Sequence, residues 1–72
     1  MMYLLSQNKK CLIHVEKVEV TGMFKTYSLT AYGAGASVWA EVGTYETEEQ
    51  AKAELAHIMA ALMNGQEVYE VR

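Results

Sequence analysis

Three kinds of side chain in this 72-residue chain could carry chemistry: two histidines (His14 and His57), one cysteine (Cys11), and a group of glutamates near residue 50. A histidine can act as an acid, a base or a metal ligand, but each role needs a partner at suitable spacing. Neither histidine has a Cys, His or Asp nearby in the sequence at the spacing of metal ligands, and the chain contains no aspartate. We therefore predict that both are surface or rim residues, and that the chain has no catalytic, cofactor-binding or metal site.

Cys11 and the glutamates have plainer structural explanations. A cysteine nucleophile needs a nearby base or a helix N-terminus, whereas Cys11 lies in the middle of a predicted strand. We expect a buried, reduced thiol, as is typical of a cytoplasmic protein. The glutamates could bind a hard cation, but the start of a helix favours the same charge, so we predict a solvated face. They are Glu46, Glu48, Glu49 and Glu54.

The run from Gly33 to Ser37 has the small residues of a phosphate-binding loop but not its context. Such loops lead into a helix, whose N–H groups bind the anion. Here a strand is expected to follow, and no Lys-Ser or Lys-Thr pair is present. We interpret Gly33–Gly35 as the tip of a β-hairpin.

A helix with clear caps is predicted over Glu48–Met63. Thr47 and Gln50 have the spacing of a capping box, and the first turn is acidic. Asn64-Gly65 provides the left-handed residue that ends such a helix. One apolar stripe follows helical spacing. Its members are Ala51, Leu55, Ile58, Met59 and Leu62.

The second half of this helix carries more apolar surface than one sheet can cover. Ala56, Ala60 and Met63 widen the stripe, and only His57 interrupts it. We therefore predict a subunit interface on Ala56, Met59, Ala60 and Met63. A small chain with one cysteine and no zinc pattern lacks other common devices for stability, so we expect a homo-oligomer, with a dimer favoured.

The rest of the chain alternates as half-buried strands do. The phase of this alternation slips between Val15 and Val18, which requires a bulge or a tight turn at Glu16-Lys17; the pattern leaves both open. We predict one α+β domain over residues 1–72. Its expected core is a twisted antiparallel meander of about four strands, with the helix packed across one face and a short final strand over 67–72. The alternation does not determine which face of the sheet is buried, since both faces carry apolar residues.

Aromatic residues suggest a second part of the interface. Phe24, Tyr32 and Trp39 are expected on one sheet face beside the Gly33–Gly35 hairpin, and such a patch on an acidic domain favours core packing or a protein contact. We include Phe24 and Trp39 in the predicted interface. A nucleic-acid-binding protein is the first alternative, and it would use four lysines around this face. They are Lys9, Lys10, Lys17 and Lys25.

The charge balance argues against that alternative. The net charge is −3, and residues 44–72 carry two basic residues against six glutamates. The only arginine is Arg72, and no basic cluster is present. A second alternative is a small enzyme or enzyme subunit, which requires His14, His57 or Cys11 to meet a glutamate in a pocket. We predict neither export nor membrane insertion, because the apolar runs are too short.

Three segments resemble a known family. Residues 2–10 are similar to the M-Y-x-[IL]-S-Q-x-K-K start of short uncharacterised proteins from Gram-positive bacteria and their phages. Residues 43–51 resemble their G-x-Y-x-T-E-E-x-A junction, and residues 68–71 resemble their ending. The resemblance implies a small cytoplasmic protein of bacterial, phage or mobile-element origin. Its motifs are turns, caps and strands, so it implies no catalytic residue. Our prediction is a non-enzymatic, self-associating interaction protein.

Overall fold

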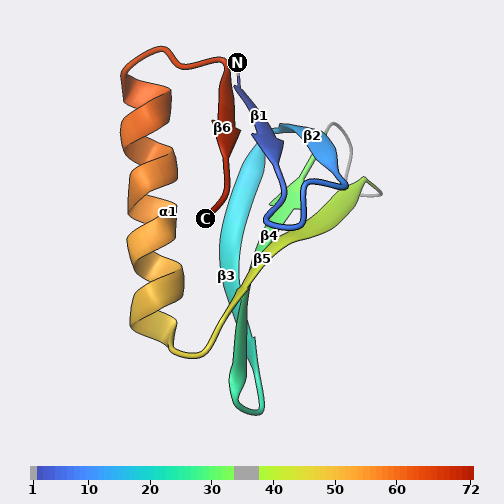
Figure 1. The fold of residues 1–72 in the computed structure, drawn as a ribbon, viewed down its shortest axis with the longest axis vertical. Helices are drawn as coiled ribbons and strands as arrows, with labels where there is room; N and C mark the ends of the chain where they lie inside the picture. Colours follow the sequence, from blue (N-terminus) through green and yellow to red (C-terminus); the bar gives the residue numbers. More distant parts are fainter. Residues whose placement is uncertain (1, 34–37) are drawn as a thin grey trace.

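The computed structural model describes residues 2–33 and 38–72, which form six strands and one helix. Figure 1 shows α1 (Glu48–Met63) running along one side of the molecule, beside the strands. The strands are β1 (Met2–Leu5), β2 (Leu12–Val15), β3 (Lys17–Met23), β4 (Thr26–Tyr32), β5 (Trp39–Tyr45) and β6 (Val68–Glu70). The predicted α+β class, the C-terminal helix packed on a sheet and the short final strand are confirmed.

The strands form two three-stranded sheets instead of one meander. One has the order β3-β4-β5 and is antiparallel throughout. The other has the order β2-β1-β6, in which β1 pairs antiparallel with β2 and parallel with β6. The last strand thus lies beside the first, at the edge of a sheet.

The division into two sheets occurs at Glu16. Val15 ends β2 in one sheet, Lys17 begins β3 in the other, and the N–H of Glu16 donates to the carbonyl of Tyr32 over 2.8 Å. The sequence left open whether a bulge or a tight turn lies at Glu16-Lys17, and the structure has a bend at Glu16 between β2 and β3. Because the phase changes there, Val18 is directed inward again and packs against the core, as Val15 does.

A β-bulge in β5 joins the two sheets. Leu29 pairs with Gly43 and Thr30 with Glu41, so Val42 is the extra residue of β5. Its carbonyl accepts the N–H of Gln7 at 2.8 Å, just beyond β1. The β4–β5 hairpin is confirmed by this pairing, although residues 34–37 at its tip lie outside the described part.

The core draws on both sheets and on the helix. Leu4 of β1, Leu29 of β4 and Val42 of β5 are fully buried at its centre. The surrounding buried apolar residues are Met2, Ile13, Ala31, Ile58, Ala61 and Val71.

The predicted caps of α1 are present. Thr47 and Gln50 form the reciprocal capping box, and Gly65 has a φ of 75°, the left-handed conformation expected after the helix. The predicted buried stripe is wrong in part, because the helix turns a different face inward. The buried positions are Ala51, Glu54, Ile58 and Ala61.

Candidate functional site

The predicted helix interface lies at the surface of α1. Ala56, Met59, Ala60 and Met63 are all exposed, Met59 by 57% and Met63 by 79%. Leu62, which we expected in the buried stripe, is 53% exposed as well. Exposed apolar side chains are ordinary when scattered, but here they follow one another along two turns of the same helix.

This surface continues into a groove between α1 and the start of β3, of about 540 Å³. We call it the α1–β3 groove. Its charged residues are Glu16, Lys17 and Lys52. Its apolar lining consists of Met2, Val15, Val18, Leu55, Ala56, Ile58, Met59 and Leu62. The volume and the apolar lining are those of binding sites in general, so the groove is the first candidate for function.

The predicted aromatic patch is not formed. Trp39 pairs with Tyr32 at one end of β4, whereas Phe24 lies in the turn at its other end, between Met23 and Thr26. Figure 1 shows that turn at the far end of the molecule from the N-terminus. Phe24 and Trp39 are both exposed, but they cannot belong to one contact surface beside the β4–β5 hairpin.

The four lysines of the nucleic-acid alternative are dispersed in the same way. Lys25 lies beside Phe24 in the far turn, and Lys9 forms an ion pair with Glu70 at 3.2 Å. Lys17 lies over the ring of Tyr32, with 5.1 Å between its Nζ and the ring centroid. They do not surround one aromatic face.

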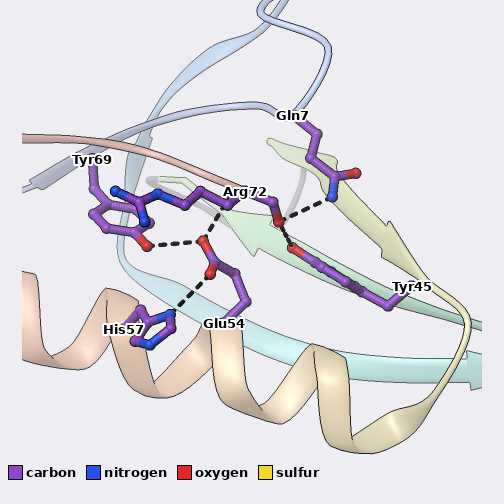
Figure 2. Close-up of polar contacts among 6 residues, drawn as sticks. All are labelled: Gln7, Tyr45, Glu54, His57, Tyr69 and Arg72. Atoms are coloured by element: carbon purple, nitrogen blue, oxygen red, sulfur yellow. Dashed lines mark hydrogen bonds and ion pairs between the residues drawn. The ribbon is translucent and has the colours of Figure 1, made fainter.

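A second candidate is a polar cluster centred on Glu54, shown in Figure 2. Glu54 is only 5% exposed, which corrects our prediction of a solvated glutamate at this position. Its Oε2 accepts the hydroxyl of Tyr69 at 2.9 Å and the backbone N–H of Arg72 at 2.8 Å. Its Oε1 lies 3.2 Å from Nδ1 of His57. A buried carboxylate is tolerated where donors surround it in this way.

Arg72 is also held through its backbone carbonyl, by side chains from β5 and from the turn after β1. The carbonyl oxygen of Arg72 accepts the hydroxyl of Tyr45 at 2.7 Å and the side-chain amide of Gln7 at 3.0 Å. The Gln7 side chain also accepts the N–H of Thr44 at 2.9 Å. The segment after β6 is therefore held between α1, β5 and the turn after β1.

Burial and negative charge raise the pKa of both tyrosines in this cluster. Burial is the main cause for Tyr45, followed by the charge of Glu54 and by Tyr69, and its pKa rises to about 12. The pKa of Tyr69 is raised by burial and by its hydrogen bond to Glu54. Both phenols stay protonated donors at neutral pH, which suits a structural role.

The cluster does bring a histidine to a glutamate, as the enzyme alternative requires. However, neither Glu54 nor His57 lines the α1–β3 groove, and Oε2 of Glu54 is occupied by two structural donors. His14 packs against the ring of Tyr3 with centroids 4.9 Å apart, and Cys11 is a half-buried free thiol just before β2. The arrangement supports attachment of the C-terminal segment better than it supports chemistry.

Sequence reasoning missed the role of Glu54, although the spacing held a signal. Glu54 is three residues after Ala51 and four before Ile58, so it falls on the inner face of the helix together with them. We assigned it by its charge and by the glutamates before it, because sequence does not show that Tyr69 and Arg72 return to this helix.

Within residues 2–33 and 38–72, no group of three or more His, Cys, Asp or Glu side chains is placed to hold a metal ion. Every buried side-chain nitrogen or oxygen in this part of the chain has a hydrogen-bond partner. The described helix is not long and apolar enough to cross a membrane.

Comparisons with protein-family models, with curated proteins and with solved structures returned no match for this chain. The resemblance to short proteins of Gram-positive bacteria and their phages therefore stays a prediction. The proposals that follow depend on the geometry of the molecule alone.

Proposed function

We propose that this protein is a non-enzymatic interaction module that forms a homodimer through the α1–β3 groove and the outer face of α1. The observation that carries the proposal is the continuity of the groove with the exposed apolar side chains of the helix. Met59 and Leu62 belong to both, and Met63 extends the surface by one more turn. A cytoplasmic location is part of the proposal, from the single cysteine in the sequence.

The area that a stable dimer needs indicates how much of this surface must take part. A standard interface buries about 800 Å² on each partner, which is roughly one sixth of the 4962 Å² that this chain exposes. A 16-residue helix is about 24 Å long and about 10 Å wide, so it presents only roughly 240 Å² in projection. The helix face alone is too small, and the groove must be covered with it.

The stability of so small a domain favours a second copy as the occupant. A chain of this size buries little apolar surface, and dimer formation adds burial without a disulfide or a metal. Ala56 and Ala60 lie one turn apart on the exposed face, which allows two helix backbones to approach closely. The lining is apolar apart from the three charged residues, as expected for the centre of a homodimer interface.

Sedimentation over a dilution series tests the proposal, with Met59→Lys as the disrupting variant. Met59 is exposed in the monomer, so the variant should fold normally. In the dimer its charge would be buried without a partner, and we expect the dissociation constant to rise at least about 100-fold.

The matched control is Leu12→Lys, which adds the same charge at a comparably exposed apolar residue, 59% exposed, on β2 outside both the groove and α1. It should leave the dissociation constant within about threefold of the unmodified protein. A chain that stays monomeric at every concentration, or equal weakening by both variants, would contradict the proposal.

A further inference from the structure

The outer edge of β3 is free in the described chain. β3 is the terminal strand of its sheet, and its seven residues pair only with β4. No other backbone hydrogen bond within residues 2–33 and 38–72 involves residues 17–23. A strand edge of this kind offers unpaired N–H and C=O groups to another strand.

This edge opens onto the surface proposed above for self-association. Lys17 and Val18 belong to β3 and also line the α1–β3 groove. A second copy that covers the groove therefore reaches the free edge as well. β3 has no proline to prevent pairing, and its only lysine is at its first residue.

We propose that β3 pairs antiparallel with β3 of a second copy. The two-fold axis passes midway between Val18 of one copy and Val18 of the other, so the two Val18 residues lie opposite each other. The two β3-β4-β5 sheets then form one six-stranded sheet. This inference rests on the proposed homodimer and specifies how its subunits are joined.

Charge complementarity selects the register. In a symmetric antiparallel pair the axis passes through one residue, which faces its own copy. An axis through Lys17 or Glu19 places like charges directly opposite each other, which is unfavourable. An axis through Val18 places Lys17 opposite the partner's Glu19, and by symmetry this ion pair forms twice. With an axis at Val20 or Thr21, neither Lys17 nor Glu19 faces a residue of the other sign on the partner strand.

The faces of β3 agree with this arrangement. Lys17 and Glu19 lie on the exposed face, 3.6 Å apart, where Glu19 also accepts the hydroxyl of Tyr32. Ion pairs between subunits on that face stay in contact with water and require no burial of charge. Val18 and Val20 point to the other face, where they pack against the core on the side of α1. The symmetry then brings both helices to one face of the joined sheet, where their exposed apolar surfaces can meet.

Disulfide cross-linking tests the register directly, in a Cys11→Ala background that removes the natural thiol. Directly opposite residues of antiparallel strands have Cα atoms about 4.5–5.5 Å apart, within the range that a disulfide spans. Val18→Cys should therefore give covalent dimers on mild oxidation. Val20→Cys is the matched control, because Val20 would face Glu16 of the partner subunit, four residues or about 13 Å from the partner's Val20. It should stay uncross-linked.

Charge exchange provides an independent test. Lys17→Glu and Glu19→Lys should each weaken their own homodimer by about tenfold, whereas a mixture of the two variants should form heterodimers. The matched control is the exposed pair Lys9 and Glu70 on the other sheet, whose 3.2 Å contact lies within one chain. Lys9→Glu and Glu70→Lys should show no preference for the heterodimer.

The outcomes separate the inference from the proposed function. A monomer at all concentrations overturns both. A dimer that cross-links at Val20 as readily as at Val18, or that cross-links at neither, overturns the β3 pairing and leaves the groove interface standing. Heterodimer preference in the Lys9 and Glu70 control equal to that of the β3 variants overturns the charge argument for the register.

Discussion

Replacing Glu54 by alanine tests whether the buried carboxylate holds the C-terminal segment on α1. The variant removes the acceptor of two short hydrogen bonds, from the Tyr69 hydroxyl and the Arg72 N–H. Hydrogen bonds to a charged group contribute about 1.5–3 kcal/mol each. The lower value applies here because Tyr69 is half-buried and Arg72 is exposed, so we expect a loss of about 3 kcal/mol.

That loss is large for this chain. At roughly 0.05–0.15 kcal/mol per residue, a 72-residue domain has about 4–11 kcal/mol of stability. For a domain of this size, a loss of about 3 kcal/mol lowers Tm by about 12–24 °C. Urea and thermal unfolding followed by circular dichroism measure both quantities, at one fixed protein concentration because dimer formation shifts the apparent stability. Amide exchange should also speed up in β6 (Val68–Glu70) before the rest of the chain.

Two further variants make the result specific. Glu49→Ala removes an exposed glutamate from the same helix and should cost less than about 0.5 kcal/mol. Glu54→Gln should cost less than Glu54→Ala, because its amide oxygen can accept from Tyr69 and Arg72 while its NH₂ group donates to His57. A Glu54→Ala variant within about 1 kcal/mol of Glu49→Ala would refute the role given to the carboxylate.

Three other predictions concern the turn and the tyrosines. Phe24 has a φ of 59°, a strained value for a bulky residue, so Phe24→Gly should raise stability by about 1 kcal/mol in thermal unfolding. The pKa of Tyr45 is raised to about 12 in the folded protein, so Tyr45 ionises at lower pH in the unfolded chain, and the fold loses stability as pH rises from 10.0 to about 12. Ultraviolet titration of Tyr45→Phe should lack the tyrosine ionisation at about pH 12. The hydrogen bond from Tyr32 lowers the pKa of Glu19, so its contribution to stability is lost progressively as the pH falls from the ordinary value of 4.5 through that lowered pKa. In Tyr32→Phe, carboxyl NMR titration should show the Glu19 pKa nearer its ordinary value.

Each of these predictions has a contrary outcome. Lys25→Gly changes the same turn at a residue without a positive φ, and a gain in stability equal to that of Phe24→Gly would disprove the strain argument. If Tyr45→Phe leaves the alkaline titration unchanged, the raised pKa belongs to another tyrosine. Tyr27→Phe should not move the Glu19 pKa, and a shift equal to that in Tyr32→Phe would rule out the hydrogen bond as its cause.

Local signals in the sequence predicted the elements that depend on local interactions. Thr47, Gln50 and Gly65 act within one turn of the helix ends, so their residue types were enough to give the bounds of α1. The change of phase between Val15 and Val18 likewise revealed the interruption at Glu16-Lys17, because alternation depends only on the strand itself.

The features that were missed depend on residues far apart in the chain. The inward orientation of Glu54 depends on Tyr69 and Arg72, which are 15 and 18 residues away. Phe24 and Trp39 were grouped by a shared alternation, which gives the face of a strand but not the position along it. The bend at Glu16 was visible, but the third strand of the second sheet requires the pairing of β1 with β6, and no local pattern encodes that pairing.

The parallel pairing of β1 with β6 has a consequence for how the chain reaches its fold. Residues 17–63 supply the β3-β4-β5 sheet and α1 as one continuous segment, whereas Tyr3 and Val68 must close a loop of 65 residues to pair. Pairing over such a long range is intrinsically slow, because the loop must close before the strands can pair. During synthesis the core therefore stays open until Val71, which is buried and donates its N–H to the carbonyl of Leu5 at 2.9 Å, has left the ribosome.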